Sequence, residues 1–332
     1  MHRRRFWIGV LISLICLALA LAGVEWGQAG AALRQADWRY LFPAGGAFLA
    51  YLVARAIRWR ILLGSKVSLA DAFAVVNVGY LVSNVFPFRL GDPARAMVIG
   101  LKHKIKTSAA LSTVVVERVL DMLTVVLLLA ATLPFVAASG WIRQTGILAG
   151  VVALVALMVL AALAQRPDWG RRAWQWSLAR IPLLRVDQVR WEGPLEGLLE
   201  GLAALRSARD VVGLAAWSVV AWMFAIGYSF AMLRAFLDQS SLAAASFLTC
   251  ATGLGMALPS SPGAVGVYHS VARYALQLPF GVPEETAVVA AFALHTFQYV
   301  VVCLLGLIGL LQQNLSLGQL RSSVATITHL EE

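Results

Sequence analysis

Three charged residues interrupt one of the long apolar segments of the chain. Glu117, Arg118 and Asp121 lie within the stretch VVVERVLDML. A charge at the centre of a membrane helix costs about 2.5–3.5 kcal/mol on insertion scales, so charges that are kept there need a reason. Glu117 and Asp121 are four residues apart and share one face of a helix, and Arg118 lies on an adjacent face. Two interpretations stay open: a structural ion-pair cluster with Arg89 or Arg95, or the wall of a water-filled cavity with a carboxylate available for protonation or cation coupling.

A second polar feature is the stretch NVFPFRLGDPAR, which begins at Asn84. Asp92 and Pro93 have the types of an N-cap and a first helical residue, because proline is tolerated at that position. Arg89 and Arg95 flank this N-terminus, whose unpaired N–H groups attract anions, and arginine adds bidentate donors suited to phosphate. With Asn84, these side chains predict a site for an anionic headgroup. The alternative is that Asp92 neutralises Arg95 and only caps the helix.

A matching interruption, LPSSPGAVGVYH, occurs later in the chain. In both stretches a proline is followed four residues later by a glycine, and a capping residue stands directly before another proline. Each therefore predicts that one helix ends, the chain turns and a new helix begins, at about residues 93–103 and 262–276. The helix-break residues are Pro87, Gly91, Pro93, Pro259, Pro262 and Gly263.

Polar side chains around the second break add to the predicted substrate site. Ser260, Ser261 and His269 belong to it, and His295 and Tyr299 lie one helical turn apart in the last apolar segment. A membrane histidine can instead form only a hydrogen bond between helices, and both roles stay open.

Three arginines, Arg55, Arg58 and Arg60, close another apolar segment. Side chains that near a helix end can snorkel to the interface, and anchoring is the favoured interpretation. Alternatively, Arg58 and Trp59 hold a lipid phosphate.

Composition places the chain among membrane proteins. Of its 332 residues 60% are hydrophobic and 13% are charged, whereas a soluble domain carries about a quarter charged residues. A spanning helix takes about 20 residues. We expect an all-α polytopic membrane protein with about six spanning helices, the first retained rather than cleaved as a signal peptide. The expected spans are residues 6–24, 40–63, 112–138, 145–164, 211–233 and 287–311.

The net charge of +10 is distributed unevenly. Lysines and arginines concentrate before the first span and in alternate loops, which is the positive-inside bias and places both termini in the cytoplasm. The basic character thus indicates orientation and contact with anionic lipid, and we expect no nucleic-acid partner.

The two breaks define a repeated order of elements. Residues 69–86 and 242–258 are apolar but stop at the prolines, which predicts two re-entrant broken helices within an inverted repeat, at about 40–138 and 211–311. Paired interruptions of this kind are typical of transporters and point to the binding site. A linker at 165–210 carries an interfacial helix at 171–185. The alternative is ordinary kinked helices or a surface loop, although irregular backbone facing lipid lacks hydrogen-bond partners.

Enzyme motifs are missing from the sequence. It contains no GxSxG, HExxH or P-loop pattern, and its three cysteines form no CxxC or Cys/His cluster. We therefore expect no enzymatic activity, no cofactor and no metal site.

Four ordered motifs, RAIRWRILLG, NVFPFRLGDPAR, VVVERVLDML and LPSSPGAVGVYHSVARYAL, resemble the flippase-like transmembrane region of the lysylphosphatidylglycerol synthase family. The resemblance covers about residues 6–312. It implies a bacterial inner-membrane protein that moves lipids, especially modified phospholipids, between leaflets. The matched residues are Asn84, Pro87, Arg89, Gly91, Arg95, Glu117, Arg118, Asp121, Pro259, Pro262, Gly263 and Gly266.

Two departures from the family pattern limit what the resemblance implies. The synthases carry a soluble aminoacyl-transferase domain after the membrane region, and this chain ends at Glu332 without one, so lysyl transfer is not expected. Many relatives also have Gly-Gly and a later acidic residue where this chain has Gly263–Ala264 and His269.

These features predict a lipid translocase for an anionic or phosphate-bearing lipid. Arg89, Arg95 and the half-helix N-termini hold the headgroup, the tails stay in lipid, and Glu117 and Asp121 couple protons. Two other functions stay open: a non-catalytic membrane partner of a lipid-modifying enzyme, and an ion or small-solute transporter. The expected partners are membrane lipids; the lipid, the direction, the energy source and the oligomeric state stay open.

Overall fold

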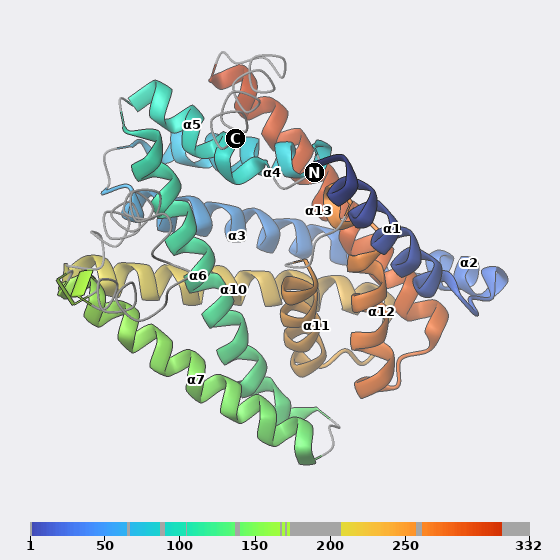
Figure 1. Cartoon of the computed structure of the whole chain (residues 1–332). Helices are drawn as coiled ribbons and strands as arrows, with labels where there is room; N and C mark the ends of the chain where they lie inside the picture. Colours follow the sequence, from blue (N-terminus) through green and yellow to red (C-terminus); the bar gives the residue numbers. More distant parts are fainter. Residues whose placement is uncertain are drawn as a thin grey trace.

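The fold is known from a computed structural model that describes residues 2–64, 67–86, 90–103, 105–136, 140–166, 168–169, 171–172, 207–256 and 261–313. The elements within these ranges are all helices (Figure 1). They are α1 (His2–Leu21), α2 (Trp26–Gln35), η1 (Trp38–Tyr40), α3 (Leu41–Leu62), α4 (Leu69–Val85), α5 (Gly91–His103), α6 (Thr107–Thr132), η3 (Leu133–Phe135), α7 (Gly140–Gln165), α10 (Ala208–Phe236), α11 (Leu242–Gly255), η6 (Pro262–Ala264), α12 (Val267–Phe280) and α13 (Glu284–Gln312).

An all-α membrane protein is confirmed, and each of the six expected spans coincides with a helix: α1, α3, α6, α7, α10 and α13. Among the described residues, three helices are long and apolar enough to cross a membrane, at Trp38–Leu62, Ala208–Phe236 and Glu284–Gln312. A fourth is added if α1 and α2, which meet at 82°, form one bent span. The count of six therefore stays a prediction.

The order of elements occurs twice. A long helix, two short helices around a break and a second long helix make up α3 to α6 and again α10 to α13. The leading helices α3 and α10 pack side by side at the centre of the molecule (Figure 1). They run antiparallel, because Arg58 near the end of α3 contacts Ser218 near the start of α10, while Tyr40 contacts Arg234 at the other end.

The short helices cross over between the two halves. Helix α4 packs along α13, the last helix of the second half, and α11 packs against α6, the last helix of the first half. Asp71 at the start of α4 accepts a hydrogen bond of 3.1 Å from Gln313, and at the other end Tyr299 of α13 donates to the carbonyl oxygen of Asn84. Each half therefore packs the first of its two short helices against the last helix of the other half.

A close contact between glycines holds α4 against α5. A Cβ added at Gly91 would overlap the carbonyl oxygen of Gly79 and the hydroxyl of Ser83. Only glycine allows the backbones to approach this closely, which explains the residue type in the first break. The helix itself begins at Gly91, so the expected start at Pro93 with an Asp92 cap is wrong.

The second break departs further from the expectation. Ser261 and Pro262 begin only the single turn η6, and the helix expected from residue 262 begins at Val267. Between them Gly263 and Ala264 have positive φ angles of 67° and 55°. Within the described residues, Ala264 is the one residue other than glycine with a positive φ.

Helix α1 is fixed to the second half by a buried arginine. The guanidinium of Arg273 in α12 donates to the carbonyl oxygens of Leu19, Ala20 and Ala22, at 2.8–3.0 Å. These last carbonyls of a helix lack partners within the helix and carry its negative dipole end, so a buried cation is favourable there. Arg273 also forms an ion pair of 2.6 Å with Glu284. The linker expected at 165–210, with its interfacial helix at 171–185, lies mostly outside the described residues.

The positive φ of Ala264 leads to a stability prediction. A side chain in left-handed backbone costs about 1–2 kcal/mol, and we expect Ala264→Gly to recover about 1 kcal/mol of unfolding free energy. Thermal unfolding in detergent measures the difference. The control Ala272→Gly, inside α12, should lower stability because glycine costs about 1 kcal/mol in a helix interior. A loss of stability in both variants would contradict the assignment of strain to Ala264.

Candidate functional site

The centre of the candidate site is a buried ion-pair network between α3 and α6. Arg55 Nη2 lies 2.5 Å from Glu117 Oε1 and 2.9 Å from Asp121 Oδ2. Arg58 Nη2 lies 3.2 Å from the same oxygen of Glu117 and 2.7 Å from Asp121 Oδ1. All four residues are buried, and the two carboxylates share one face of α6 as their spacing predicts. Of the two interpretations of these carboxylates, the ion-pair cluster is therefore the one that the geometry favours.

A third guanidinium joins the network from α5. Arg95 is 1% exposed and pairs with the second carboxylate oxygen of Glu117. Its guanidinium lies over the ring of Trp59, 4.4 Å from the ring centroid, which is within the range of a cation–π contact. Trp59 is itself held by a hydrogen bond of 3.1 Å from Nε1 to Thr113. Arg95 thus connects the first break to both α3 and α6.

The network carries more positive than negative charge. Three guanidiniums face two carboxylates, and the Nε atoms of Arg55, Arg58 and Arg95 are buried without a hydrogen-bond partner among the described residues. A buried polar group that lacks a partner is costly. Charge and donors together suit an anion with several acceptor oxygens, such as phosphate.

Two expectations about the arginines are wrong. Arg55 and Arg58 are buried among protein side chains, so they do not snorkel to the interface. Asp92 does not neutralise Arg95; it accepts two hydrogen bonds, of 2.8 and 2.9 Å, from Arg118. Both differences arise from tertiary packing, because α6 brings Glu117 to Arg95 and Arg118 to Asp92.

The two helix breaks meet. Asn84 lies in the last turn of α4 at the first break, and its carbonyl oxygen accepts a hydrogen bond of 3.2 Å from Tyr299. A Cβ placed on Gly263 at the second break would stand 3.8 Å from that same oxygen and would overlap the Tyr299 ring. The Asn84 side chain lies 3.7 Å from the sulfur of Cys303. Residues far apart in the sequence are thereby brought to one place.

Two histidines link the helices that follow the second break. His269 Nε2 lies 3.3 Å from His295 Nδ1, and its own Nδ1 accepts a hydrogen bond from the backbone N–H of Gly266. With Nδ1 an acceptor, Nε2 of His269 is the donor to His295. His269 is not a lone histidine but half of a buried pair between α12 and α13. Ser261 instead binds α1, because its N–H donates to the Ser13 hydroxyl at 2.7 Å.

Part of the predicted site lies outside the described residues. Pro87, Arg89, Pro259 and Ser260 belong to this part, and their roles stay predictions. Sequence reasoning did not assign Arg55 and Arg273 to any site, although both lie inside the motifs RAIRWRILLG and LPSSPGAVGVYHSVARYAL.

Comparison with known proteins identifies the family. The family described as lysylphosphatidylglycerol synthase TM region matches residues 6–306. The chain belongs to this family. The match includes the network, both breaks and the histidine pair. No solved structure matches the chain.

Two curated proteins are similar to the chain at low identity. "Glycosyltransferase AglD" of Haloferax volcanii is 25% identical over 93% of this chain and 54% of its own length. "UPF0104 membrane protein" of Methanothermobacter thermautotrophicus is 25% identical over 79% of this chain and 82% of its own length. The chain thus spans about half the length of the first relative and most of the second.

The network leads to a second prediction. Glu117→Gln leaves three buried guanidiniums with one carboxylate, and breaking a buried ion pair by removing one partner costs about 3–5 kcal/mol. We expect a large fall in thermal stability in detergent. The control Arg118→Gln breaks the half-exposed pair with Asp92 and should cost less than about 1 kcal/mol. Equal small decreases of the unfolding temperature in both variants would contradict the account of the network.

Proposed function

We propose that the chain is a lipid translocase that moves an anionic or phosphate-bearing lipid between the leaflets of a bacterial inner membrane. The observation that carries this proposal is the meeting of the two breaks, where Tyr299 donates to the carbonyl oxygen of Asn84 and its ring lies against Gly263. Transporters place their substrate sites where discontinuous helices of two repeats meet. The three-arginine network borders the first break, since Arg95 lies one turn into α5.

In this proposal the two halves are inverted repeats. Supporting observations are the repeated element order, the antiparallel packing of α3 on α10, and the packing of α4 on α13 and of α11 on α6. Helices α4 and α5, and α11 and α12, are then re-entrant pairs that enter from opposite sides of the membrane. Six spans and two cytoplasmic termini complete the proposed topology, following the distribution of lysines and arginines.

The proposed mechanism uses the excess positive charge of the network. A phosphate accepts hydrogen bonds from the free donors of Arg58 and Arg95, with Arg89 adding charge at the N-terminus of α5. The lipid tails stay in the membrane while the two halves change their packing. Glu117 and Asp121, proposed as proton acceptors, are bound to guanidiniums. Their protonation therefore requires the ion pairs to open, so coupling in this proposal accompanies the rearrangement.

A second candidate function is a non-catalytic membrane partner of a lipid-modifying enzyme. It is supported by the similarity to about half of a longer protein named as a glycosyltransferase. Such a partner binds lipid or enzyme but moves no lipid when purified. An ion or small-solute transporter is a weaker third candidate, distinguished by transport of solute in the absence of labelled lipid.

Reconstitution tests the proposal. Proteoliposomes carrying fluorescent phosphatidylglycerol or a fluorescent polyprenyl phosphate report translocation as loss of protection from a membrane-impermeant quencher. We expect the wild-type chain to move at least one probe. The double variant Arg95→Gln/Glu117→Gln removes a cation and an anion together, so the net charge of the network is unchanged, and it should fold but lose translocation.

The matched control is Arg118→Gln/Asp92→Asn, which removes a half-exposed pair from the same two helices. It should translocate at the wild-type rate. The proposed site is wrong if the Arg95/Glu117 double variant moves every probe as fast as this control does. No movement by the wild type would favour the partner role.

A further inference from the structure

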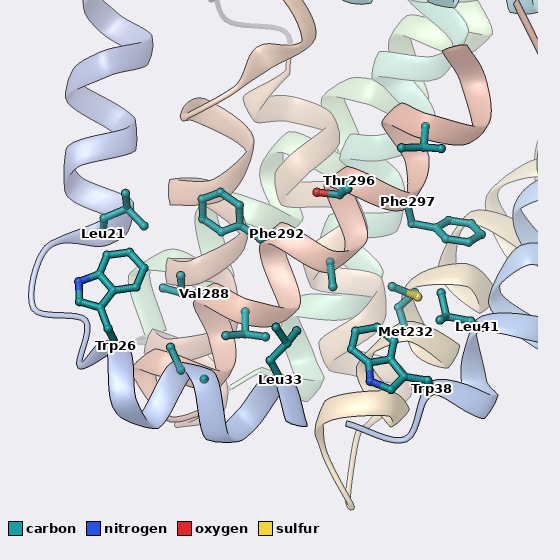
Figure 2. Close-up of a pocket in the computed structure, with 15 residues that line it drawn as sticks. Leu21, Trp26, Leu33, Trp38, Leu41, Met232, Val288, Phe292, Thr296 and Phe297 are labelled. Carbon is teal, nitrogen blue, oxygen red and sulfur yellow. The ribbon is translucent and has the colours of Figure 1, made fainter. Parts of the chain in front are cut away.

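An apolar cleft lies at the end of the molecule opposite to the arginine network. It has a volume of about 810 Å³ and lies between α2, α13, the start of α3 and the end of α10. Figure 2 shows Trp26 and Leu33 of α2 on one side, Phe292 and Phe297 of α13 behind, and Trp38 and Met232 at the other end. The volume falls within the roughly 300–1,000 Å³ range of ligand pockets. Thr296 is the single residue with a hydroxyl in this lining.

A polar pocket of about 330 Å³ adjoins the cleft. Its polar lining residues are Gln35, Asp37, Tyr40, Arg234, Asp238 and Thr286. Residues that are neighbours in the sequence line the two cavities: Asp37 lines the polar pocket and Trp38 lines the cleft. Trp38 of the cleft and Phe236 of the pocket form an edge-to-face contact with ring centroids 5.7 Å apart, so the linings of the two cavities touch here. An apolar chain and a polar group joined to it fit this pair of cavities.

The polar pocket has an available positive charge. Asp37 accepts hydrogen bonds from the side chain and backbone of Arg39, which lower the pKa of its carboxyl group, and the Arg39 guanidinium compensates the charge of the ionised carboxylate. Arg234 contacts the Tyr40 hydroxyl at 3.4 Å and the backbone oxygen of Asp238. Among the ion pairs of the described residues Arg234 has no carboxylate partner. Its guanidinium therefore donates to two neutral oxygens and is not paired with a carboxylate, while the carboxylate of Asp238 lines the same pocket.

The place of α2 indicates where the ligand comes from. This helix turns 82° away from α1 and carries exposed Trp26, while Trp38 follows it at 41% exposure. A helix that lies across the end of a span with exposed tryptophans is typical of the membrane–water interface. The cleft is thus placed to receive the tail of a lipid in the leaflet beside it.

We propose that these two cavities bind one phospholipid, with an acyl chain in the cleft and the phosphate at Arg234. This site is separate from the network: Tyr40 and Arg55 are 15 residues apart on one helical run, about 22 Å along its axis. The two sites therefore belong to opposite ends of α3. Binding here does not depend on translocation and goes beyond the proposed function.

A photoactivatable phosphatidylglycerol with a diazirine in one acyl chain tests the cleft, using the full chain in lipid nanodiscs. We expect cross-links to peptides containing Leu33 or Phe292, above those to the exposed face of α7 at Val151 and Val155, which measure general lipid contact. Gly30 lines the cleft, and a Cβ added there meets nothing within 4 Å. Gly30→Trp should fill the cleft and reduce the cross-links at Leu33 and Phe292 to the level seen on α7.

The control for the cleft is Gly27→Trp, on the same helix at a position that also meets nothing within 4 Å and does not line the cleft. It should keep the wild-type cross-links. Equal cross-linking at the cleft in the Gly30 variant and in this control would overturn the chain site.

Arg234→Gln tests the phosphate end and should weaken binding of the same lipid about tenfold, through loss of a charge-assisted hydrogen bond. Arg34→Gln, which changes an exposed arginine of α2 that lines neither cavity, should leave the affinity for this lipid unchanged. Competition with inorganic phosphate distinguishes the sources of the anion: displacement only by lipid supports a phospholipid site, and displacement by millimolar phosphate alone would contradict it.

Discussion

The structure depends on how two carboxylates are neutralised inside a membrane protein. Glu117 and Asp121 project from α6 into a buried space, where Arg55, Arg58 and Arg95 surround them. Isolated charges there would cost several kcal/mol each, so α3, α5 and α6 must pack in one arrangement. Among the residues that the structure describes, the same arrangement leaves one positive charge in excess and three Nε atoms without a hydrogen-bond partner. A structural requirement thus produces the feature that suits an anionic headgroup.

Two short helices connect this network to the other half of the molecule, because α4 packs on α13 and α11 packs on α6. Helix α4 is tied to α5 through Gly79 and Gly91 and also packs along α13 of the other half. The first break, whose new helix carries Arg95, is consequently in contact with Tyr299 and with the second break. A change in the packing of one half therefore alters the surroundings of Arg95 and its ion pair with Glu117 in the other half. Such mechanical connection is what alternating access between repeats requires.

Features that depend only on neighbouring residues in the chain could be predicted from the sequence. Prolines and glycines located both breaks, and the spacing of Glu117 and Asp121 predicted their common face. It failed where the partner comes from another helix: Asp92 binds Arg118 rather than capping α5, and Arg55 and Arg58 are covered by α6 instead of reaching the interface. Helix-end position alone does not say what packs over an arginine. The role of His269 likewise depended on His295, whose proximity no local pattern encodes.

The most direct test of the account is a reversible lock between the two halves. Asn84→Cys places a thiol beside native Cys303, since the Asn84 side chain lies 3.7 Å from that sulfur across the α4–α13 contact. Translocation of fluorescent phosphatidylglycerol is measured after oxidation and after reduction, with the disulfide verified by mass spectrometry. The account predicts that the oxidised protein stops moving lipid and that reduction restores the rate. An oxidised, fully cross-linked protein that moves lipid as fast as its reduced form would contradict it.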